Sequence, residues 1–401
     1  MRKIPFSPPD ITELEINEVA EALRSGWITT GPRTKEFERK LAEYIHAPKC
    51  VCLNSATACE EMNLRILGIG EGDEVIVPAY TYTATASAAL HTGASIKMVD
   101  IQKDCPEMDY DRLTDAITEK TKAIIPVDYA GVVCDYDKLF EIAESKKSSF
   151  RPKTKIQEAV GRVAIVADCA HSLGAARNGK IAGEIADFSS FSFHAVKNLT
   201  TAEGGASVWK KLDGIDDEEI YRQYQLYSLH GQSKDALAKT KLGAWEYDVL
   251  GTWYKCNMTD IMAAIGLKQF ERYPKLIERR FEIIAQYDKA MNELGIDYLH
   301  HSGKNFRSSG HLYITRVPGA SLERRNEIIT KMAEQGVAAN VHYKPLPMLT
   351  AYKQLGFDAK DYPNAVAYFT NEISLPLHTL LTDEDVQYVI EAYSKALEET
   401  K

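Results

Sequence analysis

Short runs of branched apolar residues alternate with segments of helical periodicity over residues 50–145. The apolar runs are CVCLN, DEVIVPA, SIKMVD and KAIIPVDY, and each precedes a segment in which apolar residues recur every three or four positions. Such alternation is typical of parallel strands connected and covered by helices. The pattern therefore predicts an α/β fold with a mainly parallel sheet.

Two helices are predicted before the first of these strands. In DITELEINEVAEALRSG we expect Asp10 to be the N-cap, and TKEFERKLAEYIH places Phe37, Leu41 and Ile45 on one stripe. A basic, weakly periodic stretch, residues 146–157, interrupts the later alternation, and we interpret it as a peripheral insertion. The strand pattern resumes afterwards at VAIVADCAH.

A second α/β region follows a mostly helical stretch that ends near residue 290. It contains the predicted strands HLYITRV and VAANVHY and the predicted helices LERRNEIITKMAEQG and TDEDVQYVIEAYSKALEE. A chain of 401 residues is long enough for one large and one smaller domain. We therefore predict a large domain over residues 1–270 and a smaller C-terminal α/β domain over residues 271–401.

Composition narrows the class of protein. Hydrophobic residues at 45% and charged residues at 26% are ordinary for a globular chain, and the net charge of −9 argues against nucleic acid or an anionic membrane as the main partner. The seven cysteines show no ligand-like pairing, which favours reduced thiols. Without an apolar signal or a stretch long enough to span a bilayer, we expect a cytoplasmic enzyme.

Two unusual peptides stand where predicted strands end, the usual place for ligands in α/β proteins. NSATA, residues 54–58, opens a helix whose free amides and dipole favour an anion, although a simple N-cap would explain the same residues. PAYTYTAT places Tyr80 and Tyr82 at a strand end. These rings either pack in the core or stack on a flat ligand.

A carboxylate and a lysine follow two further strands. Asp168 ends the apolar strand of VADCAH, so it needs a cationic partner, either a ligand's protonated ring nitrogen or a basic side chain. Lys197 lies in FSFHAVKNLTTAEGG among hydroxyls suited to phosphate, and it could form an imine with an aldehyde or simply hold a phosphate at the surface. Together these groups suit pyridoxal phosphate, and no metal-ligand cluster or hydrolytic triad competes.

The stretch SFHAVKNLTTAEGG resembles the signature of the DegT–StrS family of sugar-nucleotide aminotransferases. The resemblance extends from GWITTGP to LPLHTLLTDEDV and implies the aspartate-aminotransferase-like α/β fold (fold type I), with a seven-stranded, mainly parallel sheet. It implies that Lys197 is the catalytic residue that carries the cofactor. The other cofactor-binding residues that it implies are Ser55, Ala56, Thr57 and Ser192 at the phosphate, Tyr82 on the ring, Asp168 at the pyridine nitrogen and His171 nearby.

The segment YKCNMTDIMAAIGL is similar to the one that reaches into the neighbouring subunit's site in this family, which implies a homodimer with shared sites. Lys255 stands where many members have asparagine, and we expect it to bind the cofactor's phosphate. Ala202 stands where glycine is common. For the substrate we expect Thr30, His342 and Tyr343, although His342 could instead cap a strand.

The resemblance implies transfer of an amino group from L-glutamate to a nucleotide-linked keto-sugar, with Lys197 moving the proton. The family uses 3-keto and 4-keto sugars. The segments NMTDIMAAIGL and VHYKPLP resemble the 4-amino branch, notably enzymes that make UDP-2-acetamido-4-amino-2,4,6-trideoxyhexose (AATGal) for surface polysaccharides. Sugar dehydrases of the family carry histidine instead of lysine, so Lys197 favours transamination. A dehydrase and a non-catalytic, cofactor-binding regulator are the alternatives.

Overall fold

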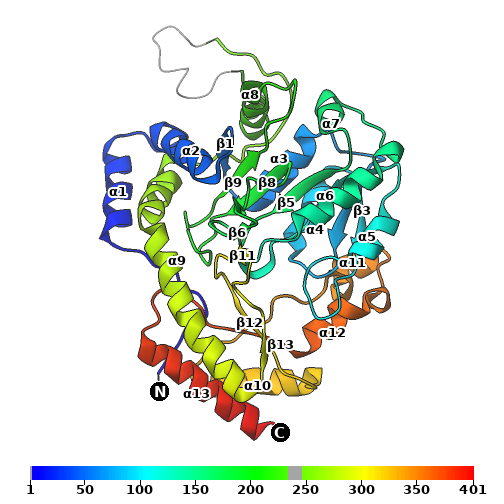
Figure 1. Ribbon diagram of the computed structural model, residues 1–401. Helices are drawn as coiled ribbons and strands as arrows, with labels where there is room; N and C mark the ends of the chain where they lie inside the picture. The colour runs from blue at the N-terminus through cyan, green and yellow to red at the C-terminus, as the bar shows by residue number, and fades with distance from the viewer. Residues whose placement is uncertain (1, 234–245) are drawn as a thin grey trace.

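A seven-stranded sheet forms the centre of the large α/β region in the computed structural model, which describes residues 2–233 and 246–401 (Figure 1). Its strands, in spatial order, are β1 (Cys50–Leu53), β9 (Gly205–Trp209), β8 (Phe188–Ser192), β5 (Ala164–Asp168), β4 (Thr121–Ile124), β2 (Glu74–Pro78) and β3 (Ser95–Val99). Only β9 runs antiparallel to its neighbours in this sheet, and the strands from β8 to β3 are parallel. The predicted mainly parallel, seven-stranded sheet is confirmed.

Alternate residues of the strands face two separate cores, as the two-residue period of a strand requires. In β1, Cys50 and Cys52 face one core, whereas Val51 and Leu53 face the other. The first core is covered by α2 (Pro32–Ile45), α5 (Tyr110–Ala116), α6 (Tyr136–Ser145) and α9 (Asp260–Leu294). The second is covered by α3 (Ala56–Ile66), α4 (Thr83–His91), α7 (Lys155–Val160) and α8 (Asp217–Ser228).

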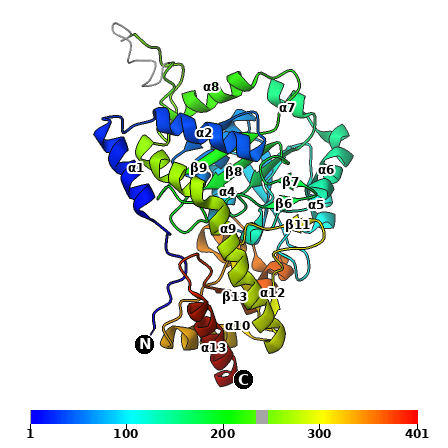
Figure 2. The ribbon, with the colours of Figure 1, turned by 60° about the vertical axis from the view of Figure 1, so that its left-hand side comes forward.

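A smaller α/β region lies at the far end of the long helix α9, as Figures 1 and 2 show. Its antiparallel sheet has the order β10 (Asp297–Tyr298), β12 (Tyr313–Arg316) and β13 (Glu372–Leu375). The helices α10 (Leu322–Glu334) and α13 (Asp383–Glu399) pack with α9 around a third core. The short helices α11 (Thr350–Gln354) and α12 (Pro363–Asn371) link this sheet to the large region.

Both ends of the chain lie in this smaller region (Figures 1 and 2). Ile4 is buried in the third core, and its backbone bonds to Gly336 and Ala338. Helix α9 continues without a break through residue 270, where we placed the boundary between domains. The division at residue 270 stays a prediction, but the first residues of the chain pack with the C-terminal region.

A small third sheet joins the two regions, with the order β11 (Phe306–Arg307), β6 (Ala176–Arg177) and β7 (Lys180–Ile181). It connects residues that follow β5 to residues that precede β12. Across the part of the chain that the structure describes, no helix combines the length and apolar character needed to cross a bilayer.

The predicted cap of the first helix is wrong. Helix α1 (Glu13–Arg24) is capped by Thr12, whose side chain accepts from Leu14 N–H while Glu15 accepts from Thr12 N–H at 2.7 Å. This is the reciprocal pattern of a capping box. Asp10 instead accepts hydrogen bonds from Arg272 and Thr379, 2.6 Å each.

The predicted strand VAANVHY is also wrong, because residues 337–343 form only single bridges. Asn340 pairs with Ser374 of β13, but the next donor, His342 N–H, bonds to the Glu372 side chain at 3.0 Å. A carboxylate therefore replaces the carbonyl that would have continued the ladder. The peripheral insertion over residues 146–157 stays a prediction; most of the segment is exposed or half-buried, but Gln157 is buried and donates to the Leu67 carbonyl at 2.8 Å.

Candidate active site

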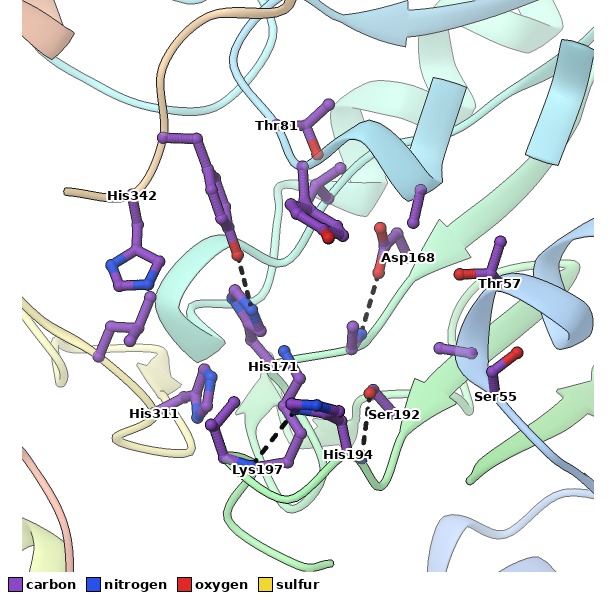
Figure 3. A pocket seen from close by; sticks show the side chains of 18 of the residues that line it. Ser55, Thr57, Thr81, Asp168, His171, Ser192, His194, Lys197, His311 and His342 are labelled. Carbon is purple, nitrogen blue, oxygen red and sulfur yellow. Dashed lines mark hydrogen bonds between the residues drawn. The ribbon is translucent and has the colours of Figure 1, made fainter. Parts of the chain in front are cut away.

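One cavity of about 460 Å³ lies at the carboxyl ends of β5 and β8 (Figure 3). All the predicted site residues except Thr30 and Lys255 line it. We call Ser55, Asp168, Ser192 and Lys197 the sheet wall, because they follow strands of the large sheet. We call His311, His342 and Tyr343 the C-terminal wall, because they come from the last hundred residues.

Asp168 is the last residue of β5, a strand that is buried throughout. Its carboxylate accepts from Thr85 Oγ1 at 2.8 Å and from Ala170 N–H at 3.0 Å. Burial raises the pKa of Asp168, while these bonds and the positive charge of Lys197 oppose the rise. No salt bridge to Asp168 is present among the described residues, so its partner by charge in the cavity is Lys197 or a bound cation.

Lys197 follows β8 in a turn closed by its own N–H, which donates to the His194 carbonyl at 2.9 Å. Burial lowers the pKa of its ammonium group to about 8, although the negative charge of Asp168 acts in the opposite direction. A lysine with this pKa is partly neutral at physiological pH, so it can act as a nucleophile and carry a proton.

The N-terminus of α3 offers an anion site next to these two residues. Ser55 is the N-cap, and its Oγ accepts from Ala58 N–H at 3.1 Å, so capping and cavity lining coexist at this residue. The β9 backbone approaches so closely that a Cβ on Gly205 would lie 2.5 Å from the Ala56 nitrogen. Free helix amides, the helix dipole and the nearby hydroxyls of Thr57 and Ser192 suit a phosphate group.

The two tyrosines of PAYTYTAT have different environments. Tyr80 is buried in the core, where its hydroxyl donates to the His342 carbonyl at 2.8 Å. Tyr82 is 59% exposed and lines the cavity, with its ring centroid 5.8 Å from that of Tyr343. Core packing is therefore correct for Tyr80, and only Tyr82 presents a ring to a ligand.

His171 connects the two walls through its ring nitrogens. Burial lowers its pKa far below the ordinary value, so the ring is neutral. Ala130 N–H donates to Nδ1 at 3.2 Å, which leaves the ring proton on Nε2, 3.1 Å from the Tyr343 hydroxyl. Nε2–H therefore donates to Tyr343, whose own proton remains for an acceptor in the cavity.

Thr30 and Lys255 lie together outside the cavity. The Lys255 ammonium contacts the Asn257 side chain, which donates to Thr30 Oγ1 at 2.6 Å. Lys255 is exposed, and neither it nor Thr30 lines the cavity of its own chain. Their predicted roles therefore depend on a neighbouring subunit or on a substrate that extends beyond the cavity.

Several cavity residues were not predicted from the sequence, among them Glu60, His311 and Phe6. Glu60 of α3 is 1% exposed, lines the cavity and has no partner for its Oε1. His311 precedes β12, with its ring 4.3 Å from that of His171, and Phe6 stacks on His342 at 5.4 Å. The position of Glu60, one turn beyond the NSATA peptide, is the signal that could have revealed it. Phe6 and His311 have no comparable signal in the sequence.

These residues fit pyridoxal phosphate. The cavity combines a half-buried lysine for the aldehyde, a buried carboxylate for the pyridine nitrogen and a helix N-terminus with hydroxyls for the phosphate. The close approach at Gly205 leaves no room for a side chain beside this helix terminus. The individual roles of these residues stay predictions.

Similar proteins support the same chemistry. The aminotransferase Spr1654 of Streptococcus pneumoniae, a candidate sugar aminotransferase, has been solved in a PLP form and a PMP form, at 58% and 60% identity with TM-scores of 0.96 and 0.97 over 100% of both chains. PseC of Helicobacter pylori, an aminotransferase involved in pseudoaminic acid biosynthesis, is 29% identical, with a TM-score of 0.86 over 99% of this chain and 100% of PseC.

Among curated proteins, the spore coat polysaccharide biosynthesis protein SpsC of Bacillus subtilis is 35% identical over 396 residues, 97% of this chain and 96% of SpsC. The model of the DegT/DnrJ/EryC1/StrS aminotransferase family matches residues 9–394. These matches cover nearly the whole chain. With Lys197 and Asp168 in one cavity, they establish that the chain belongs to the DegT/DnrJ/EryC1/StrS aminotransferase family.

Proposed function

We propose that this enzyme transfers the amino group of L-glutamate to the C4 keto group of a nucleotide-linked 6-deoxyhexose, for the synthesis of a surface polysaccharide. The observation that carries the proposal is the position of half-buried Lys197 and buried Asp168 in one cavity with a phosphate-suited helix terminus. The names of SpsC and PseC, a polysaccharide protein and a pseudoaminic acid aminotransferase, support an amino-sugar product.

In this proposal, pyridoxal phosphate supplies an electron sink that stabilises negative charge on the carbon that gains or loses a proton. Lys197 binds the cofactor and, when free, moves the proton at that carbon. Asp168 keeps the pyridine nitrogen protonated. Ser55, Thr57 and Ser192 hold the phosphate, and Tyr82 lies against the ring.

The C-terminal wall is suited to a sugar rather than to a second charged group. Its two imidazoles are neutral, because burial lowers the pKa of His342 to about 4 and that of His311 well below its ordinary value. Neutral imidazole and phenol groups donate to and accept from hydroxyls. We propose AATGal-type substrates on this basis and on the resemblance of VHYKPLP to the 4-amino branch.

The alternatives are a sugar dehydrase and a regulator that binds the cofactor without turnover. The lysine at position 197 favours transamination over the dehydrase. Loss of the cofactor's visible absorption on addition of L-glutamate, with formation of 2-oxoglutarate, is the expected result. An unchanged spectrum with glutamate would contradict the aminotransferase proposal.

The substrate is tested by incubating the loaded enzyme and glutamate with matched 4-keto and 3-keto nucleotide sugars, followed by NMR of the products. We expect amine at C4 and none at C3. Amination at C3 alone would contradict the proposed position but leave the aminotransferase intact. The NMR coupling constants also determine whether the new amine is axial or equatorial.

We also propose a homodimer with shared sites, located in the cytoplasm. Apolar side chains of α1 and of residues 249–250 are about half exposed, namely Leu14, Ile16, Leu23, Val249 and Leu250. Burial of such side chains against a second copy would stabilise a dimer. The seven cysteines are all free, which agrees with a reducing compartment.

Mixed dimers test the shared site. A dimer of one Lys255→Ala chain and one Lys197→Ala chain contains one site with both lysines, if Lys255 acts across the interface. We expect activity to return when the two inactive variants are mixed and refolded together. Persistent inactivity of a verified mixed dimer would contradict a role for Lys255 across the interface.

A further inference from the structure

Three side chains form a hydrogen-bonded chain behind the C-terminal wall. Ser374 Oγ lies 2.6 Å from Glu372 Oε1 and 2.8 Å from His342 Nδ1. Glu372 and Ser374 stand two residues apart on β13, so their side chains share a face of the strand. His342 is the only member that lines the cavity. The order from the interior to the cavity is Glu372, Ser374, His342.

In this series of three side chains, every polar atom except His342 Nε2 has a hydrogen-bond partner. Glu372 Oε2 accepts from the His342 backbone N–H at 3.0 Å, so Oε1 is left to Ser374. The Ser374 hydroxyl has one proton, and it can donate to only one of its two neighbours. Among the described residues, no hydrogen bond to His342 Nε2 is present, which leaves this nitrogen for a ligand in the cavity.

Glu372 is fully buried, and burial raises the pKa of its carboxyl group to about 8, although Ser374, the His342 amide and Arg325 act in the opposite direction. The other titratable groups whose charge is coupled to Glu372 are the buried phenols Tyr80, Tyr129, Tyr343, Tyr368 and Tyr393. Burial raises the pKa of each of these phenols, so they stay neutral around pH 8. Glu372 is therefore the group of this cluster that changes charge there.

His342 remains neutral over the same range of pH. Burial lowers its pKa to about 4, and the positive charge of Lys197 adds to this effect. The neighbouring histidines His171 and His311 are also neutral, because burial lowers the pKa of each well below its ordinary value. A neutral imidazole carries one proton, on either Nδ1 or Nε2, and its hydrogen bonds decide which.

The two charge states of Glu372 require opposite directions of the hydrogen bonds. When Glu372 is ionised it only accepts, so Ser374 donates to it and His342 donates from Nδ1, which leaves Nε2 as an acceptor. When Glu372 is protonated it donates to Ser374, Ser374 donates to Nδ1, and Nε2 carries the proton. Each arrangement satisfies every partner in the chain.

We propose that Glu372 and Ser374 are positioning residues that determine whether His342 presents a hydrogen-bond donor or an acceptor to the cavity. A proton taken up at Nε2 is balanced by transfer of the Nδ1 proton to Ser374 and of the Ser374 proton to Glu372. The imidazole itself gains no charge. The cavity can thereby exchange a proton with a buried carboxylate that no ligand touches.

The test follows the tautomer of His342 by NMR of the whole chain, labelled with ¹⁵N at its ten histidines and free of cofactor and substrate. His342→Gln assigns the signals. Between pH 6.5 and 9.5, we expect the ¹⁵N chemical shifts of Nδ1 and Nε2 to change places. Nε2 should have the shift of a protonated nitrogen at low pH, and Nδ1 should have it at high pH. The midpoint should lie near the pKa of Glu372, about 8.

Two variants distinguish proton transfer through Ser374 to Glu372 from a purely structural role of these two residues. In Glu372→Gln, the amide oxygen faces the His342 N–H and the amide NH₂ faces Ser374, so Nε2 should stay protonated at every pH. In Ser374→Ala, the connection is lost and the tautomer should no longer change near pH 8. Ser302→Ala, an exposed serine, is the matched control and should behave as the wild type.

If the ¹⁵N chemical shifts of His342 in the wild type did not change with pH, the proposal would be overturned. A wild-type change that persists in Glu372→Gln or in Ser374→Ala would also overturn it, because the signal would then come from another group. Melting temperatures establish that each variant is folded, and either variant alone suffices if the other does not fold. Since no cofactor or sugar is present, this test fails or succeeds independently of the proposed function.

Discussion

The two walls of the cavity differ in charge and in origin. The sheet wall carries the ionisable pair Asp168 and Lys197, and its groups stand directly after strands of one sheet. The C-terminal wall presents neutral rings, which are held by hydrogen bonds from distant elements, such as that from Tyr80 to the His342 carbonyl. The difference supports our proposal that the sheet wall binds the charged groups of the cofactor and that the C-terminal wall binds the neutral parts of a substrate.

The largest effect is expected at Lys197, because both half-reactions need its amine. Lys197→Ala should lower glutamate-dependent amine formation by about 10³-fold or more, since a proton carrier and nucleophile is lost. Steady-state assays and the visible spectrum of the protein mixed with pyridoxal phosphate measure this. Lys360→Ala is the control, because that side chain is 89% exposed and should have no effect. Turnover above one-tenth of the wild-type rate would remove Lys197 from the mechanism.

Asp168→Asn should slow both half-reactions by about 10²-fold, because a preorganised charge at the cofactor is lost. The substitution should also change the pH at which the Lys197 amine loses its proton. In the cofactor-free wild type, the Lys197 amine is acylated at a series of pH values and the extent of reaction is measured by mass spectrometry. The midpoint of this reaction should lie near the pKa of Lys197, about 8. Since the charge of Asp168 raises that pKa, the midpoint should move to lower pH in the variant. A midpoint that stays or rises would show that the two groups do not interact.

Glu60, next to the sheet wall on α3, tests whether the cavity contains a buried acid that is costly to ionise. Burial raises the pKa of Glu60 well above the ordinary value of 4.5, so the folded protein holds a proton that the unfolded chain loses as the pH rises. Relative to Glu60→Gln, the wild type should therefore lose stability above pH 4.5, by up to about 1.4 kcal/mol per pH unit. Melting temperatures at several pH values measure the difference. Glu203→Gln is the control, since the Glu203 side chain is 67% exposed and lies on the same cavity.

Tyr343→Phe should affect only the half-reaction of the sugar. The variant loses the hydroxyl that accepts from His171 and that can donate to a ligand. A hydrogen bond of about 1 kcal/mol corresponds to a rise of roughly fivefold in KM for the keto-sugar. The rate of the glutamate half-reaction, measured by rapid mixing, should change less than about twofold. Equal losses in both half-reactions would contradict the separation of the two walls.

The smallest effect is expected at Ala202, in the turn that follows Lys197. Its φ of +70° lies in the left-handed region, which costs a residue with a Cβ about 1 kcal/mol. Ala202→Gly removes this strain but adds freedom to the unfolded chain, so we expect a gain below about 1 kcal/mol and unchanged activity. Ala351→Gly, in helix α11, should destabilise the protein instead. A loss of stability in Ala202→Gly would mean that the turn does not strain alanine.

The sequence predicted best where local pattern and local structure coincide. Helix α2, with Phe37, Leu41 and Ile45 buried on one stripe, and the mainly parallel sheet follow directly from periodicity, whereas the number of seven strands was implied by the family resemblance. The cap at Thr12 was missed although the T-x-x-E pattern was visible, because Asp10 offered an equally good cap residue. The strand over residues 337–343 was predicted from its apolar pattern, but the Glu372 side chain takes the hydrogen bond that would have extended it.

The sequence by itself determined that the residues of the sheet wall lie close together. Parallel strands of one sheet bring their carboxyl ends to the same edge, together with the polar residues at and after those ends. Only the tertiary structure placed the C-terminal wall opposite the sheet wall; His342 and Tyr343 were expected from the sequence as substrate residues, but His311 was not. Phe6, His311 and His342 are separated by hundreds of positions or by several elements, and only the packing of the smaller region against the large sheet brings them to one cavity. Burial then sets the charge states of His311 and His342, because a pKa depends on the surroundings of a group and not on its neighbours in the chain.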